Sequence, residues 1–214
     1  AIREKQFVED LENIARLLLE EIGLPSFSTN SAGAMGLCRK NAEQVQLTTE
    51  DRGLAMETLL RLTRKYNGRI SASAGPLAEA RAWGVMEKAR GEKKNGMPNR
   101  GYLTACGCPM QKMGVRADGV MVPCGQIPHL EMGRVKRDDL REVWQGHPVL
   151  EDMRERRNIP LGSFEFCRGC EYIPYCTGNC PAIAYTITGK VNHPSPDACL
   201  RNFLEEGGRL PGAG

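Results

Sequence analysis

The sequence predicts an α/β layer followed by a small, turn-rich α+β domain built around metal-ligating cysteines. Three observations support this prediction. Helix and strand patterns alternate over residues 1–75, turn signals dominate the second half, and eight of the nine cysteines lie between Cys106 and Cys199. The 214 residues are enough for one large domain or two small ones.

The chain begins with a predicted helix, a short strand and a glycine-rich loop. Gly23 and Pro25 end the helix. Residues 26–29 predict a short buried strand, and the small residues 30–36 predict a loop that can approach a ligand closely. The apolar positions of the helix recur at helical spacing: Phe7, Leu11, Ile14, Leu18 and Ile22.

A second helix and strand follow. Thr48 and Asp51 form a predicted capping box at the helix start, and Asn67-Gly68 ends the helix. Residues 69–73 predict the next strand, so the order helix, strand, helix, strand indicates a parallel layer. A complete barrel or doubly wound sheet needs more units. Together with the missing initiator methionine, this predicts the tail end of a larger domain, hence a fragment.

The boundary between the two predicted domains lies in a basic segment. Residues 78–88 predict one more helix, and residues 87–101 carry glycines and basic side chains but few large apolar ones. This composition is typical of a solvated connection. We therefore expect domains at residues 1–86 and 102–204, joined by a linker over 87–101 and followed by a flexible tail over 205–214.

The second half predicts short elements separated by turns. Residues 114–123 alternate around Asp118-Gly119, which predicts a hairpin with a two-residue turn that delivers Cys124 at its end. Asp138 or Asp139 can cap a helix carrying Leu140, Val143 and Trp144, which His147-Pro148 interrupts. Further helices are predicted over residues 149–157 and 181–188.

The cysteine spacing indicates metal rather than disulfide chemistry. Cys167-Arg168-Gly169-Cys170 places two thiolates on one tight turn, and Cys176 and Cys180 follow closely. An odd cysteine count without a visible export signal favours metal binding in a reducing cytosol. Both zinc and iron–sulfur clusters use such turns, and the ligands are too many for one ion. Spacing alone favours iron–sulfur only modestly, and His129, His147 and His193 are interpreted as surface residues.

Composition excludes two classes of partner. The formal net charge of +3 comes from 29 basic and 26 acidic residues, a balance that gives no reason to expect nucleic-acid binding. No apolar run reaches the roughly 18 residues of a membrane helix. We expect a cytoplasmic protein without nucleic-acid or membrane partners.

The cysteine pattern resembles a known signature. Cys108 is followed by ten residues, Gly119, four residues and Cys124, and after a gap by the run from Cys167 to Cys180 and then Cys199. This arrangement resembles the seven-cysteine signature of the SPASM domain, the auxiliary-cluster extension of radical SAM peptide- and protein-modifying enzymes. The resemblance covers roughly residues 102–204. Upstream, the order of elements is similar, more weakly, to the last units of the partial TIM barrel of radical SAM cores.

The resemblance implies two [4Fe–4S] clusters with interleaved ligands. The first cluster would take Cys106, Cys108, Cys124 and Cys180, so that Cys180 leaves its own run to join the hairpin site. The close pair Cys106-Gly107-Cys108 departs from the wider spacing of related enzymes, which leaves open the alternative that one of its thiols is spare. The second set would be Cys167, Cys170, Cys176 and Cys199.

Two departures limit what the resemblance implies. The CxxxCxxC triad of the radical SAM core is absent, and Cys38 stands alone as a predicted buried thiol, so this chain by itself is not competent to cleave S-adenosylmethionine. Gly125 follows the hairpin cysteine where anaerobic sulfatase maturases place an acid, which weighs against that subclass. Gly33 and Gly36 are candidates to line the S-adenosylmethionine or substrate cavity, against the alternative of a plain turn.

The resemblance thus predicts the C-terminal part of a radical SAM/SPASM maturase. The complete enzyme would use S-adenosylmethionine and a third [4Fe–4S] cluster, act on a peptide or small protein, and exchange electrons with a ferredoxin or flavodoxin. Two other functions stay open: a zinc-stabilised interaction module and a stand-alone electron-transfer protein. Four residues near the ligands are candidates for contacts to clusters or substrate, against the alternative of surface or packing roles: Arg116, Arg168, Tyr175 and Asn179.

Overall fold

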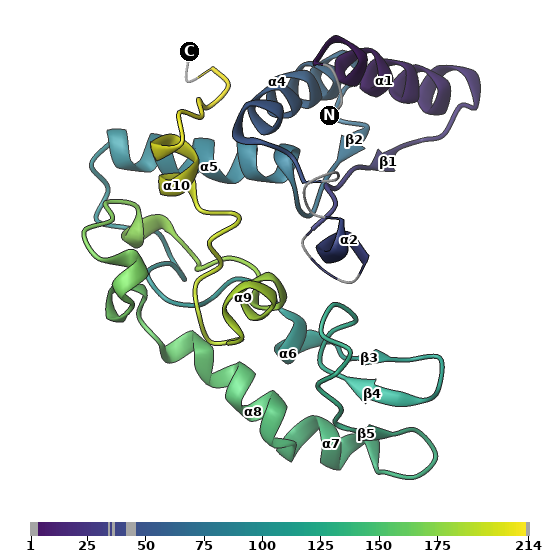
Figure 1. Cartoon of the computed structure of the whole chain (residues 1–214), viewed down its shortest axis with the longest axis vertical. Helices are drawn as coiled ribbons and strands as arrows, with labels where there is room; N and C mark the ends of the chain where they lie inside the picture. Colours follow the sequence, from purple (N-terminus) through teal and green to yellow (C-terminus); the bar gives the residue numbers. More distant parts are fainter. Residues whose placement is uncertain (1–3, 34, 36, 42–45, 213–214) are drawn as a thin grey trace. The chain divides into compact units, whose positions relative to one another are not determined.

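The computed structural model describes residues 4–33, 35, 37–41 and 46–212 (Figure 1). The chain divides into two compact units, which we call unit 1 (residues 1–93 and 200–214) and unit 2 (residues 94–199). None of the described helices is long and apolar enough to cross a membrane. The roles predicted for residues 1–86, 87–101, 102–204 and 205–214 stay predictions.

Unit 1 contains helices around a small parallel sheet. Strand β1 (Phe27–Ser28) pairs in parallel with β2 (Ile70–Ser71), with Phe27 opposite Ile70. The predicted alternation and parallel pairing are therefore present, in a sheet that has two strands among the described residues. The helical elements are α1 (Glu4–Arg16), the π-helix Leu17–Glu21, α2 (Leu37–Lys40), α4 (Thr49–Lys65), α5 (Pro76–Gly91) and α10 (Leu200–Glu205).

Helix α4 forms where the sequence places its start and end signals. The Thr48 hydroxyl accepts from the Asp51 N–H at 3.1 Å, and the Asp51 carboxylate accepts from the Thr48 N–H, which confirms the capping box. Asn67 and Gly68 then adopt φ values of 51° and 80°, a left-handed conformation that ends the helix.

The apolar face predicted for the first helix was partly wrong. Ala15 and Leu19 are buried, and Leu11 packs beside them, whereas Ile14 is 47% exposed and Ile22 is 57% exposed. The reason is that the helix packs on α4, which lies alongside it in Figure 1, and no described element of unit 1 fully covers the side bearing the two isoleucines.

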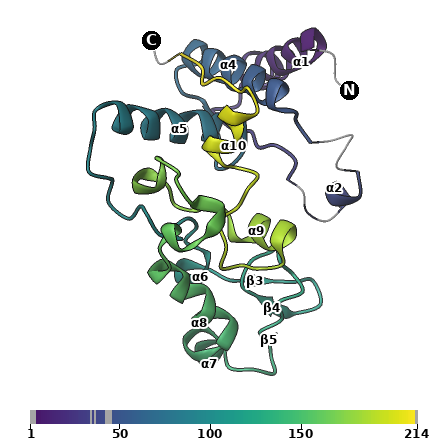
Figure 2. The ribbon, with the colours of Figure 1, turned by 60° about the vertical axis from the view of Figure 1, so that its left-hand side comes forward.

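Unit 2 consists of short elements. A three-stranded antiparallel sheet has the order β3 (Gly114–Val115), β4 (Val120–Val122) and β5 (Gly133–Arg134), and the sequence analysis missed β5 because two residues show no alternation. Helices α7 and α8 succeed each other along one side of the unit (Figure 2). The helical segments are α6 (Cys108–Gln111), α7 (Leu140–Gly146), α8 (Pro148–Glu155), α9 (Pro181–Thr188) and four 3₁₀ turns at Arg156–Asn158, Leu161–Ser163, Glu165–Cys167 and Ile173–Tyr175.

The predicted hairpin forms, but its turn is one residue longer than expected. Arg116 donates its N–H to the Val120 carbonyl at 2.8 Å, which leaves Ala117, Asp118 and Gly119 as a three-residue loop. Gly119 has a φ of +85°, and its N–H donates to the Arg116 carbonyl at 2.9 Å. A type I turn followed by a left-handed glycine is the usual three-residue hairpin connection.

The two helices after the sheet are separated as predicted. The Asp139 carboxylate caps α7 by accepting from the Arg141 and Glu142 N–H groups at 2.9 and 3.0 Å. His147 caps α8, because its Nδ1 accepts from the Val149 N–H at 3.3 Å. His147 therefore has a local structural role, beyond the plain surface position expected.

Candidate metal centre

The first predicted ligand group converges on the hairpin. Burial, together with the neighbouring side chains of Cys106 and Cys124, raises the pKa of the Cys108 thiol to about 12. Burial also raises the pKa of Cys180, and the nearby Cys106 and Cys124 raise it further. Cys180 thus lies within electrostatic range of the hairpin cysteines, although it belongs by sequence to the other run.

Backbone conformation directs the sulfurs of this group. Cys106 adopts a φ of +70°, which is uncommon for a residue with a side chain, and its Sγ accepts from the Cys108 N–H at 3.4 Å. Cys124 follows β4, and its Sγ accepts from the Gln126 N–H at 3.5 Å. Cys180 directly precedes α9. The backbone N–H groups of Ile183 and Ala182, in the first turn of this helix, lower the pKa of the Cys180 thiol and so oppose the effect of burial.

The second predicted group surrounds Cys176. Burial raises the pKa of this thiol, the Gly178 N–H lowers it, and Cys199 and Cys170 raise it again. Cys176 also packs against the apolar cluster that contains Cys167. The four predicted ligands of the second cluster are therefore neighbours in the structure.

A β-turn brings Cys167 and Cys170 together. The Cys170 N–H donates to the Cys167 carbonyl at 3.1 Å. Arg168 has φ and ψ of −57° and 130°, and Gly169 has a φ of +72°. These are the angles of a type II turn, which requires a positive φ at its third residue and so favours glycine there.

The segment between Cys176 and Cys180 is fixed by backbone contacts. Asn179 donates its side-chain N–H to the Ala198 carbonyl at 2.6 Å, and Ser195 donates its N–H to the Gly178 carbonyl at 2.9 Å. Asn179 directly precedes Cys180, and Ala198 directly precedes Cys199. This contact connects segments that carry ligands of both predicted clusters.

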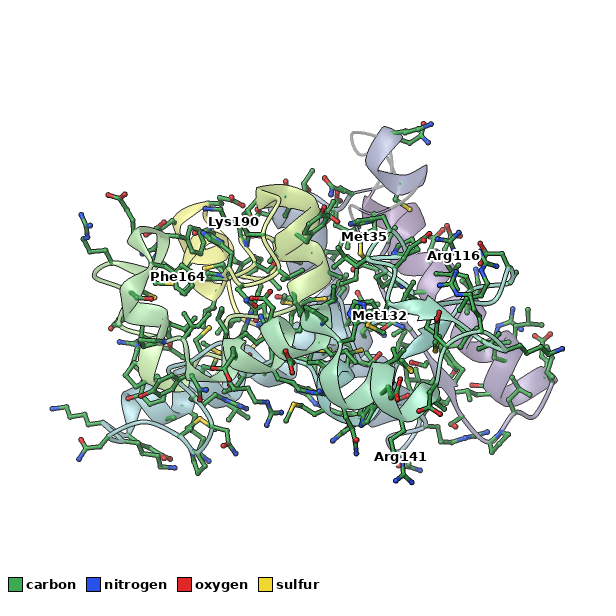
Figure 3. The ribbon with its side chains drawn as sticks, turned by 90° about the horizontal axis from the view of Figure 1, so that it is seen from below. Met35, Arg116, Met132, Arg141, Phe164 and Lys190 are labelled. Carbon is green, nitrogen blue, oxygen red and sulfur yellow. The ribbon has the colours of Figure 1, made fainter. Side chains whose placement is uncertain are left out.

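The other candidate residues have structural partners. The Arg116 guanidinium, labelled in Figure 3, pairs with Asp118 at 2.6 Å and Glu131 at 2.7 Å and donates to the Pro128 carbonyl. The Tyr175 hydroxyl donates to the Lys94 carbonyl at 2.6 Å. Arg168 forms an exposed pair with Glu165 at 3.4 Å. These contacts support the surface or packing alternative for Arg116, Tyr175 and Arg168.

The candidate residues of unit 1 are described only in part. The Gly33 carbonyl accepts from the Met35 N–H at 2.7 Å, a contact that fits the plain-turn alternative. Gly36 lies outside the described residues, so its predicted role in lining a cavity stays a prediction. Cys38 lies on α2 and is half-buried, where the sequence analysis expected a buried thiol.

Sequence reasoning missed Arg156. Its side chain is 1% exposed, and its Nη1 donates to the Ala105 carbonyl at 2.7 Å. Burial lowers the pKa of the Arg156 guanidinium, whereas Cys106 and Cys180 raise it. One signal could have found it: Leu150, Met153 and Arg156 are three residues apart, and Leu150 and Met153 are fully buried.

The ligand set fits an iron–sulfur cluster. The donors are thiols with backbone N–H groups directed at several sulfurs, as iron–sulfur sites require. Among the residues that the structure describes, no three His, Cys, Asp or Glu side chains surround one point closely enough to hold a single ion. A cubane spreads its ligands more widely, because each thiolate binds a different iron atom.

Comparison with known families identifies one domain within unit 2. Residues 106–171 match the SPASM domain, an iron-sulfur cluster-binding domain. The predicted resemblance is thereby confirmed over this range, and the SPASM match favours iron–sulfur over zinc. The matched range includes Cys106, Cys108, Cys124, Cys167 and Cys170.

Comparison with known proteins adds one relative. An uncharacterized protein of Archaeoglobus fulgidus is 30% identical over 94 residues, which is 44% of this chain and 22% of that protein. The chain thus spans about a fifth of the length of the curated relative that it matches. No solved structure gives a significant match.

Proposed function

We propose that this chain is the C-terminal part of a radical SAM/SPASM maturase and that unit 2 holds two auxiliary [4Fe–4S] clusters. The observation that supports this proposal is the approach of Cys180 to Cys106 and Cys124, in a chain whose residues 106–171 match the SPASM domain. Such a crossover is what interleaved ligands of two clusters require, and it has no use in a pair of independent metal knuckles.

The proposed ligand assignment follows the two groups of thiols. Cys106, Cys108, Cys124 and Cys180 would hold the first cluster, and Cys167, Cys170, Cys176 and Cys199 the second. When bound, the clusters supply one-electron transfer. The chain itself buries two of these thiols, Cys108 and Cys167, and its backbone N–H groups donate to the sulfurs of Cys106, Cys124 and Cys176.

The remaining parts of the proposal concern the complete enzyme. There, a third cluster would bind S-adenosylmethionine, and the auxiliary clusters would accept or relay the electron released as a peptide or small protein is modified. A cytoplasmic ferredoxin or flavodoxin would exchange that electron. The coding sequence upstream of Ala1 tests this part: an in-frame CxxxCxxC supports it, and a start codon at that point contradicts it.

Metal analysis of the anaerobically prepared chain tests the cluster assignment. We expect a brown protein with about eight irons per chain. Cys180→Ser should lose about half of the iron, because Cys180 serves the first cluster alone. Cys38→Ser is the matched control and should keep all of it. A colourless protein with two zinc ions would contradict the proposal and favour the zinc-stabilised module.

A further inference from the structure

Unit 2 contains a buried cation, Arg156, that pairs with no carboxylate of the described residues. Arg156 is the largest of its fully buried side chains, and one of its three guanidinium nitrogens, Nη1, has a hydrogen-bond acceptor, the Ala105 carbonyl. Its Nε and Nη2 atoms are buried, and nothing in the described part of the chain accepts a hydrogen bond from them. A guanidinium carries five N–H donors, so most of the donor capacity of Arg156 is unused.

This arrangement is costly unless something else faces the guanidinium. Buried charges in proteins are normally paired or coordinate a metal site, because removing a charge from water is strongly unfavourable. The ionisable groups that act on Arg156 are Cys106, Cys180 and Arg157, and no carboxylate is among them. Two of these three groups are proposed ligands of the first cluster.

We infer that Arg156 is the internal counter-charge of the cluster held by Cys106, Cys108, Cys124 and Cys180, and that its Nε and Nη2 donate hydrogen bonds to the sulfur atoms of that site. The inference rests on the proposed function. Four thiolates around a cubane of charge about +2 leave a net charge of about −2, which a buried cation compensates. Arg156 then acts as a positioning and tuning residue that never contacts the substrate.

The cation should favour the reduced cluster. One-electron reduction makes the site more negative, so a nearby positive charge stabilises the reduced form more than the oxidised form. Hydrogen bonds to the sulfurs act in the same direction, since they withdraw electron density from the cluster. Loss of Arg156 should therefore lower the reduction potential of the first cluster and leave that of the second unchanged.

A purely structural role is the competing explanation. The hydrogen bond from Arg156 to the Ala105 carbonyl fixes the backbone just before Cys106. Arg154, on the same helical segment, is a matched structural control: it donates to the Trp144 and Pro109 carbonyls at 2.6 and 2.9 Å. Arg157 is exposed and controls for the loss of one positive charge.

The test is a redox titration of the whole chain with both clusters, followed by electron paramagnetic resonance. In Arg156→Gln we expect the equilibrium constant for reducing the first cluster to fall at least tenfold, which is about 59 mV for one electron. Arg156→Lys keeps the charge but loses the planar fork, so it should show a smaller shift. Arg154→Gln and Arg157→Gln should leave both potentials unchanged.

The outcomes separate this inference from the proposed function. Both clusters present in Arg156→Gln with wild-type potentials would overturn the inference alone. Should Arg156→Gln lose the first cluster, Arg156→Lys decides: a lowered potential supports the inference, and an unchanged one overturns it. A wild-type chain without iron would overturn the proposed function and this inference with it.

Discussion

Units 1 and 2 are similar in size, but different interactions hold each one together. Among the described residues, one apolar cluster of unit 1 joins seven buried residues from α1, its π-helical extension, α4 with the following Tyr66, β2 and α5. Two apolar clusters of unit 2 contain four and three buried residues, and one of these is Cys167 itself. In the proposed assignment, metal–thiolate bonds would join these separate apolar clusters of unit 2 and add to its folding energy. We therefore expect the folding of unit 2 to depend on bound iron–sulfur clusters, and the folding of unit 1 to be independent of them.

Removing iron should have the largest effect on this contrast. Chelation of the anaerobic protein should abolish most amide protection in unit 2, because its proposed ligands lie on segments far apart in sequence, and leave α4 of unit 1 protected. Hydrogen exchange of the whole chain, measured before and after chelation, reports both units in one sample. Equal protection of residues 94–199 with and without iron would show that apolar packing alone suffices there.

Truncating a buried side chain of unit 1 should have the opposite effect: unit 1 loses stability and unit 2 keeps its iron. Leu62 is 1% exposed in the core of unit 1, so Leu62→Ala should destabilise that unit by about 2–5 kcal/mol and leave the iron content unchanged. Trp83, which is buried in unit 1, reports its unfolding by fluorescence in a Trp144→Phe background. The control is Ile14→Ala, at a half-exposed position, where a much smaller loss is expected. Iron loss in Leu62→Ala would contradict the independence of the units.

A smaller effect is expected from one added methyl group in unit 2. Gly178 has a φ of +75°, and a Cβ there would lie 2.3 Å from the Leu103 Cδ2 atom. Gly178→Ala should therefore cost about 1–3 kcal/mol and shift the loop that carries Cys176. Gly169 is the matched control: its φ is +72°, but a Cβ would meet nothing within 4 Å.

The comparison of these two variants has a defined readout. Retention of iron during mild chelation should fall further in Gly178→Ala than in Gly169→Ala, because both replacements bear backbone strain but only the first also bears a clash. Equal losses would mean that the positive φ, and not the contact with Leu103, determines the effect.

The smallest expected effect concerns acid and unit 1. The hydrogen bond from the Tyr66 hydroxyl at 2.6 Å lowers the pKa of Glu20, and Lys65 and Arg16 lower it further. A lowered folded-state pKa contributes stability above the unfolded value of about 4.3, and this contribution is lost as pH falls through the folded pKa. Tyr66→Phe should flatten that acid-side decline in the melting temperature followed by Trp83. A decline identical to wild type would rule out this pair as its source.

Local signals predicted local structure well. The Thr48 capping box, the Asp139 cap, the helix over residues 181–188 and the Asp118-Gly119 hairpin all form, because each depends on a few consecutive residues. The hairpin turn was wrong by one residue, since strand register and turn type are decided together by the pairing of Arg116 with Val120. The exposed Ile14 was missed because burial depends on which helix packs against it.

The candidate site likewise combines features that the sequence predicts with one that only tertiary packing determines. The ligand sets implied by the family resemblance stay a prediction, and the structure places Cys180 within electrostatic range of Cys124, as the interleaved assignment requires. Arg156 was hidden in the run Arg154-Glu155-Arg156-Arg157, where sequence gives three similar cations and only packing makes one of them buried. A charged residue that is buried by tertiary packing leaves no signal in the local sequence beyond its helical spacing from other buried residues.

The short segment from Cys176 to Cys180 has a consequence for electron flow. Four residue steps span at most about 14 Å of fully extended chain. In the proposed assignment its two ends serve different clusters, so the two metal centres are held within range of direct electron tunnelling. If both clusters bind as proposed, an electron arriving at either one could pass to the other without a third carrier, in the direction that the two reduction potentials set.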